Sequence, residues 1–494
     1  MRRGPLAGRY RAAAGMVIFA LVPYLALSAA LQPLTPIIAG DLHMSLTSMS
    51  LAFGMGNAGY AAGTVLAVAF AQHLPQRRML VVYAVLLVVG SCLAAGAQNA
   101  AMFFAGHILQ GACTSLLLIA AVPPLAISFG KERLRETAMI MNMCIFGAVA
   151  IGPAVGGLQA HAHAWRPLFL IVAVISLAAL VLALLTFEDA PAMDPSAPWD
   201  PRAIALAVAG PTAAFFGASE LISHPFLAVS TAVPLATGLV LILVLVAYQY
   251  RAKRPLLTIR GMLRSSMPVA GLVVALFAAA ASVSATELTA GVLASRYGPI
   301  HVGLLYLPEL AGAILTAFAL GAVITKRAMH YLPLAGMVFL AAGIAVFRVE
   351  VPSSQALTLI GSGLTGIGLG ATVAPALFVA GFSLPSASLQ RVFALVELLR
   401  AVAAFMIAPI FAHMAETVGG NVNAGTGIAL WIGLGLAVGG AVIAVLIYAL
   451  SGARPQTPDL DEFLDGDSAA WHSPPLLAAL RSPPTGRVLA DETA

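Results

Sequence analysis

The feature that most constrains this chain is a series of long apolar runs separated by short charged or proline-containing segments. A helix that crosses a bilayer needs about 20 apolar residues. Fourteen runs of this kind can be marked, and they cover residues 14–39, 46–70, 79–97, 101–128, 136–158, 167–187, 202–218, 227–248, 267–294, 301–325, 330–347, 355–382, 391–415 and 427–450. The run at 202–218 is short and holds Pro211 near its middle, so twelve spans remain the alternative. The sequence predicts an all-α polytopic membrane protein.

The composition excludes the other broad classes of protein. Hydrophobic residues make up 60% of the chain and charged residues 9%, against roughly 45–50% and 25% in soluble domains. Disorder is excluded because the apolar content is too high. The three cysteines, Cys92, Cys113 and Cys144, lie inside apolar runs, so we expect packing residues and no disulfide framework. The first apolar run continues past Ala30 to Ala39, which predicts an uncleaved first helix and no signal peptide.

The lysine and arginine residues predict the orientation of the chain. With fourteen spans and the N-terminus in the cytoplasm, 21 of them fall on the cytoplasmic side, three fall outside and Arg400 lies within a span. Such a bias is typical of membrane proteins and places both termini inside the cell. The net charge of +5 therefore fixes topology at the anionic leaflet and indicates no nucleic-acid partner. We predict a multi-pass protein of the cell (inner) membrane, with the lipid bilayer as its surroundings.

The distribution of spans and linkers predicts the domain organisation. The expected segments are a cytoplasmic arm (1–13), a first six-helix half (14–187), a proline-rich linker (188–201), two additional helices (202–248), a basic linker (249–266), a second six-helix half (267–450) and a disordered cytoplasmic tail (451–494). Two six-helix halves are the usual plan of secondary transporters.

Acidic and basic residues inside spans are functional candidates, because a buried charge in lipid costs several kcal/mol. Glu309 lies deep in the tenth expected span and directly follows Pro308, and Glu287 lies toward the outer end of the ninth. A carboxylate at either depth could bind a proton. Glu397 and Arg400 are three residues apart on one helix face. We interpret them as a buried structural pair, with gating as the alternative.

The remaining candidates are aromatic and amide residues in the spans, which suit an amphipathic ligand. The substrate-cavity candidates are Asn57, Tyr60, Asn142, Phe146 and Tyr306. We find no catalytic motif, no phosphate-cradling loop and no metal-ligand spacing. The sequence therefore predicts neither an enzyme nor a cofactor, and it leaves an ion gradient as the energy source.

A glycine-rich stretch in the fifth span is the most specific motif. It consists of Gly147, Gly152, Pro153, Gly156 and Gly157. Small residues allow close helix packing, and proline removes a backbone hydrogen bond. With this stretch the chain resembles the major facilitator superfamily, and within it the drug:proton antiporter branch with fourteen spans.

Further segments carry the same resemblance, which extends over about residues 10–450. They are 109–111, 165–169, 254–257, 303–308 and the glycines at 363, 366, 368 and 370 followed by Arg400. The resemblance implies two halves that rock around a central site, with the glycine-rich stretch serving as that branch's antiporter motif.

The chain also departs from the family pattern at two places. The loop after the second span keeps Arg77 and Arg78 but lacks the acid that helps to latch the halves on the cytoplasmic side in the family. In the fourth span His107 stands where the family usually has an arginine tied to proton coupling. A histidine can still bind a proton, so His107 joins Glu309 and Glu287 as a proton-coupling candidate, against the alternative of a histidine hydrogen-bonded inside the bundle.

The function predicted from these features is proton-coupled efflux of an amphipathic small molecule by alternating access. The expected partners are the substrate and protons, with a periplasmic adaptor subunit under one hypothesis. The alternatives are an uptake permease or uniporter, the inner-membrane component of an envelope-spanning export assembly, and a sensor that has lost transport.

Overall fold

A computed structural model describes residues 5–187, 191–466 and 468–478. Residues 1–4 of the expected arm, 188–190 of the linker, and 467 and 479–494 of the tail lie outside the described residues, as do the side chains of 283 and 284. The described chain is all-helical and contains fourteen helical segments long and apolar enough to span a membrane. The prediction of fourteen spans is thus confirmed, and the twelve-span alternative is wrong.

The first half has six spans made from eight helical elements. They are α1 (Tyr10–Asp41), α2 (Leu46–His73), α3 (Gln76–Ala95), α4 (Ala100–Ile127), α5 (Lys131–Asn142), the π-helical turn η1 (Met143–Gly147), α6 (Ala148–His161) and α7 (Arg166–Thr186). α5, η1 and α6 form one continuous span. A π-helical turn inside an α-helix is rare and frequently marks a functional region.

The additional helices and the second half follow. They are α8 (Pro201–Ser219), η2 (Glu220–Ile222), α9 (Val229–Arg251), α10 (Ile259–Leu263), α11 (Ser266–Ala294), α12 (Pro299–Leu305), α13 (Leu307–Val323), η3 (Arg327–His330), α14 (Leu332–Val349), α15 (Gln355–Phe382), η4 (Ser386–Ser388), α16 (Leu389–Thr417), α17 (Val422–Ser451) and α18 (Leu460–Asp465). α8 packs on α9 and on α2, so this pair adds to the bundle at the side of the first half. Reciprocal hydrogen bonds between Ser219 and Ser50 fix the contact with α2.

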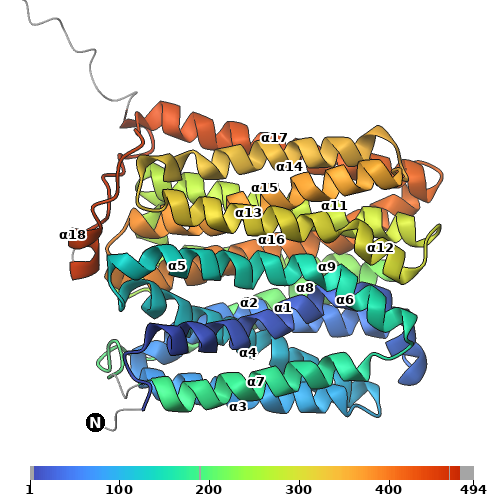
Figure 1. The fold of residues 1–494 in the computed structure, drawn as a ribbon, viewed down its shortest axis with the longest axis horizontal. Helices are drawn as coiled ribbons and strands as arrows, with labels where there is room; N and C mark the ends of the chain where they lie inside the picture. Colours follow the sequence, from blue (N-terminus) through green and yellow to red (C-terminus); the bar gives the residue numbers. More distant parts are fainter. Residues whose placement is uncertain (1–4, 188–190, 467, 479–494) are drawn as a thin grey trace, which may run out of the picture.

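The two halves lie beside each other with their helix axes roughly parallel (Figure 1). Their most extensive contacts are α6 with α12, α2 with α16, and α5 with α13. The first contact is very close, because a Cβ atom at Gly157 would overlap the backbone of Pro299 and one at Gly303 would overlap that of Pro153. The glycine-rich motif therefore brings the backbones of the two halves together near the outer face.

The structure differs from the expectation of a disordered tail. Residues 458–466 include the short helix α18, and Phe463 and Trp471 are buried. The two aromatic side chains pack against Phe382 at the cytoplasmic end of α15. The acidic, proline-rich composition suggested disorder, but a few apolar residues between the acids are enough to attach this segment to the bundle.

Gly156 provides a test of the helix packing that the glycine-rich motif allows. A Cβ atom at this position would overlap the backbone of Ala30 in α1. We expect Gly156→Leu to lower the free energy of unfolding by about 1–3 kcal/mol, because the extra side chain cannot fit without moving a helix. Thermal unfolding of the purified protein in detergent measures the change.

Gly435 in α17 is the matched control, because nothing lies within 4 Å of a Cβ atom built there. Gly435→Leu should change stability by less than about 0.5 kcal/mol. Equal losses in the two variants would contradict the packing that we assign to the motif.

Candidate functional site

A cavity of about 90 Å³ lies between the two halves. Its walls come from α1 and α6 of the first half and from α11, α13 and α15 of the second. The lining residues are Ser28, Ala29, Gln32, Val149, Pro153, Ser282, Thr286, Glu287, Ala290, Glu309 and Leu369. Most of this wall is apolar or carries a hydroxyl or amide group. The two carboxylates are therefore its most distinctive feature.

Glu309 is held in place by a break in the tenth span. The helix is interrupted at Tyr306, between α12 and α13, and Pro308 has no backbone N–H with which to continue the hydrogen-bonding pattern. Glu309 consequently lies in the first turn of α13, where the helix dipole favours a negative charge. Gly366 of α15 allows the Glu309 backbone to approach closely, since a Cβ atom there would overlap it.

Glu287 reaches the same cavity from the neighbouring span α11. Its side chain is solvent-accessible through the cavity. Its backbone carbonyl accepts a hydrogen bond of 3.2 Å from Gln32 Nε2 of α1, which links the two halves at the cavity wall. Within residues 5–187, 191–466 and 468–478, no lysine, arginine or histidine forms an ion pair with Glu287 or Glu309. The cavity thus holds two acids without a protein counter-charge in the described chain.

A second polar contact between the halves lies deeper in the bundle. Tyr60 of α2 donates a hydrogen bond of 3.2 Å to Glu397 Oε2 of α16. Arg400 donates to the same carboxylate, with Nη2 at 2.6 Å and Nε at 3.1 Å. All three side chains are buried. From the sequence we expected Glu397 to pair with Arg400 and Tyr60 to line the substrate cavity. In the structure Tyr60 is hydrogen-bonded to the ion pair.

The other cavity candidates do not line the cavity between the acids. Asn142 is fully buried and, with its amide correctly oriented, donates to the Gly370 carbonyl and accepts from the Ala317 backbone N–H, both at 3.1 Å. The Tyr306 hydroxyl lies 2.6 Å from Thr289 Oγ1 of α11. Phe146 is buried in the turn η1.

Asn57 is half-buried on α2 and likewise does not reach this cavity. Sequence position gave the depth of these residues in the membrane, but it did not give the helix face on which each of them lies.

His107 is separated from both acids. It is buried within the first half among the rings of Tyr24, Phe53 and Phe103. Its Nδ1 lies 3.4 Å from Gln110 Oε1 on the same helix. The structure therefore favours the alternative interpretation, in which this histidine is hydrogen-bonded inside the bundle. It does not bring His107 to the cavity.

The cytoplasmic loop reveals a residue that the sequence did not single out. Arg77 donates to the Leu184 carbonyl at the end of α7, and Arg78 is exposed. The linker lies beside this loop, where the backbone N–H of Asp194 donates to the Gln72 carbonyl. A hydrogen bond from Ser196 holds the pKa of Asp194 below its ordinary value, and the nearby cations Arg254 and Arg391 act in the same direction.

Asp194 thus places a carboxylate at the cytoplasmic end of α2, close to where the sequence lacks one. Its cationic neighbour Arg391 lies in the first turn of α16 of the second half. The sequence shows that the linker contains this acid. Only the fold shows that the linker returns to the cytoplasmic end of α2. In the part of the chain that the structure describes, no cluster of histidine, cysteine or acidic residues could hold a metal ion.

The fold places an acidic cavity between two six-helix halves. The model of the Major Facilitator Superfamily matches residues 16–331. The chain belongs to this superfamily and is a multi-pass protein of the cell membrane. Members of the family are transporters and not enzymes, which confirms the expectation from the sequence.

Relatives with assigned names include multidrug transporters at low identity. The chain is 26% identical over 323 residues to "Multidrug resistance protein B homolog" of Mycobacterium tuberculosis, which covers 62% of this chain and 57% of that protein. It is 26% identical over 370 residues to "Multidrug efflux pump LfrA" of Mycolicibacterium smegmatis, covering 71% and 70%. The matches to the M. tuberculosis protein and to the transporter YubD of Bacillus subtilis span 57% and 62% of those relatives' lengths.

Solved structures show the same fold. The human organic anion transporter MFSD10 superposes with a TM-score of 0.62 at 14% identity, covering 88% of this chain and 99% of that one. An auto-inhibited peptide transporter of the POT family superposes with a TM-score of 0.60 at 13% identity, covering 89% and 96%. At these identities the likeness concerns the fold alone.

Removal of Arg400 tests the polar contact between α2 and α16. We expect Arg400→Leu to lower the free energy of unfolding by about 3–5 kcal/mol, because Glu397 would then be a buried charge without a cation. The double variant Arg400→Leu with Glu397→Leu should recover most of that loss, because the charge is removed with its partner. Thermal unfolding in detergent measures both. If the double variant unfolds at least as readily as Arg400→Leu, this pairing does not stabilise the bundle.

Proposed function

We propose that this protein is a proton-coupled antiporter that exports an amphipathic small molecule. The observation that carries the proposal is the cavity between the halves with Glu287 and Glu309 in its wall and no counter-charge from the described residues. The named multidrug transporters among the relatives support the direction and the substrate class.

The chemistry follows from the cost of placing charge in a membrane. An ionised Glu309 in this cavity is unfavourable until a proton or a ligand compensates it. A proton taken up from the outer side would neutralise the carboxylate and remove the penalty. Substrate and proton compete for one cavity, so the arrival of one favours release of the other. Glu287 is a second proton acceptor within the same wall.

The contacts between the halves supply the two-state element that such coupling needs. Gln32 donates to the Glu287 backbone, and Tyr60 donates to Glu397. Both bonds cross from one half to the other. The proposal is that rocking of the halves breaks and remakes these bonds as the cavity changes the side to which it opens.

The chemistry of the cavity wall supports the proposed substrate class. Apolar side chains such as Val149 and Leu369 alternate with the hydroxyl groups of Ser28 and Thr286 in its wall. Such a lining suits a ligand with an apolar body and one polar end. No observation on the described residues favours an adaptor subunit, and the proposal does not include one.

Transport by purified protein in proteoliposomes tests the proposal. The probes are permanently charged and neutral amphipathic dyes, and liposomes without protein correct for passive uptake. With an acidic lumen, wild-type protein should accumulate dye inside, because protons leave as the dye enters. Glu309→Gln should lower this accumulation to background while dye exchange without a gradient persists, and Glu287→Gln should reduce it less.

Glu416→Gln is the matched control, because Glu416 is an exposed acid at the outer end of α16. It should transport like the wild type. Accumulation only with an acidic exterior would show uptake by symport in place of antiport. Gradient-driven accumulation that survives in Glu309→Gln would contradict the coupling that we propose.

A further inference from the structure

The C-terminal segment crosses the cytoplasmic end of the bundle. We call residues 452–466 and 468–478 the C-terminal strap. It leaves α17 at one edge of the second half and runs along the helix ends toward α5 of the first half (Figure 1). α18, in the middle of the strap, lies against α5 and η4. The strap therefore connects the two halves on the side where the cytoplasm begins.

The strap is attached firmly to the second half. Trp471 Nε1 donates a hydrogen bond of 2.7 Å to Ser383 Oγ, and the Ala470 backbone N–H donates at 2.8 Å to the Phe382 carbonyl. Further along, the Ser266 backbone N–H donates at 2.9 Å to the Pro474 carbonyl. With Phe463 and Trp471 buried against Phe382, this part of the strap should move as one body with the second half.

The contact with the first half is of a different kind. Lys131, at the start of α5, donates a hydrogen bond of 2.8 Å to Asp461 Oδ2 of α18. The side chains are 55% and 73% exposed, so water can replace either partner at small cost. A strong attachment at one end and a weak ionic attachment at the other are what a releasable connection requires.

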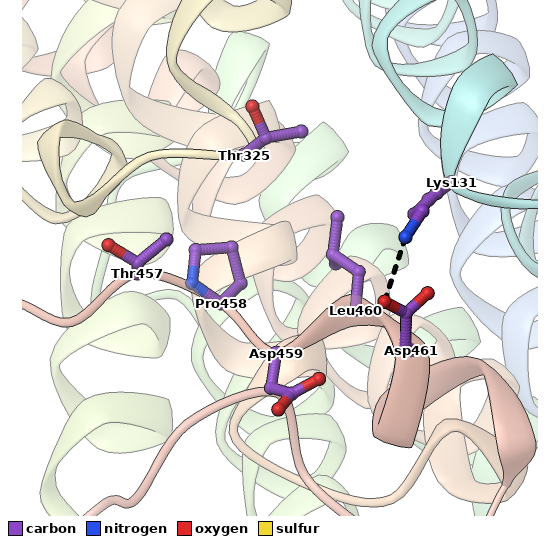
Figure 2. A pocket seen from close by; sticks show the side chains of 7 residues that line it. All are labelled: Lys131, Thr325, Thr457, Pro458, Asp459, Leu460 and Asp461. Carbon is purple, nitrogen blue, oxygen red and sulfur yellow. Dashed lines mark hydrogen bonds and ion pairs between the residues drawn. The ribbon is translucent and has the colours of Figure 1, made fainter.

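Lys131 and Asp461 both line an open hollow of about 450 Å³, and Figure 2 shows them together on one side of its lining residues. Lys131 points into the hollow from the first half, and Asp461 points toward it from α18. The other lining residues are Thr325, Thr457, Pro458, Asp459 and Leu460. α18 also contacts α5 directly, and the ion pair adds a charged side-chain link between the strap and the start of α5.

We propose that the C-terminal strap is a cytoplasmic latch that closes on Lys131 when the inner ends of the two halves are together. Separation of α5 from α13 on the cytoplasmic side carries Lys131 away from Asp461. The strap stays with the second half, so each inward opening breaks this ion pair and each closure reforms it. The latch adds stability to the inward-closed state and lowers the fraction of molecules that open to the cytoplasm.

Thiol labelling tests the latch without a gradient or a substrate, so its failure is distinct from a failure of the proposed antiport. Met139 of α5 lies against Gly321 of α13, at the cytoplasmic contact between the halves. Met139→Cys, in full-length protein with Cys92, Cys113 and Cys144 changed to alanine, reports opening on that side. The rate of reaction with a membrane-impermeant maleimide is measured in inside-out vesicles.

Reversing one charge should raise the labelling rate about two- to fivefold, the range that an exposed ion pair supports. This holds for Asp461→Lys and for Lys131→Asp, and the double variant with both reversals should return to the wild-type rate. Asp465→Lys is the matched control, since Asp465 is an exposed acid of the same helix without an ion pair to the described residues. It should label like the wild type.

The proposal is overturned if the single reversals label like Asp465→Lys, or if the double variant fails to restore the rate. If gel filtration shows that a charge reversal impairs folding, Asp461→Asn replaces it in the test, because it removes the charge with little change in shape. A cross-link provides the opposite test. Lys131→Cys and Asp461→Cys are joined by a bifunctional thiol reagent, which holds the closed state. The rate at which Met139→Cys is labelled should then fall below the rate in the protein without these two cysteines. An unchanged rate after complete cross-linking would also overturn the latch.

Discussion

The structure depends on the placement of two carboxylates, one buried (Glu309) and one reached through a cavity (Glu287), between helix bundles that otherwise offer apolar and hydroxyl side chains. Glu287 and Glu309 face one cavity, and no described cation compensates them. In a membrane such charge is unfavourable, and the surrounding features accommodate it. The break at Tyr306 gives Glu309 a helix N-terminus, and the glycines of α15 bring its backbone close to the neighbouring helix. A proton is the simplest group that can relieve the remaining cost.

Several polar contacts join the two halves, including that of the buried Asn142 with the Gly370 carbonyl. Gln32 with Glu287, Tyr60 with Glu397, and Lys131 with Asp461 join helices of opposite halves. Close glycine packing of α6 on α12 supplies the apolar part of the interface. An interface made of close backbone contacts and breakable hydrogen bonds is compatible with two discrete arrangements of rigid halves.

The sequence predicted the spans and placed the two acids within them, because hydropathy acts locally along the chain. It could not show which residues face one another. Gln32 and Glu287 are 255 positions apart, and only the packing of two halves brings them together. For the same reason Tyr60 was assigned to the cavity, His107 was retained as a coupling candidate, and Asp194 was missed. The strap was missed because its few apolar residues stand among acids and prolines.

The central claim is that Glu309 takes up a proton within the cavity, and infrared difference spectroscopy measures this directly. Acidification of the purified wild-type protein should produce the carbonyl band of a newly protonated carboxyl group. The component of this band that comes from Glu309 should be missing from the same titration of Glu309→Gln and retained in Glu416→Gln. A protonation band that persists in full in Glu309→Gln would contradict the account.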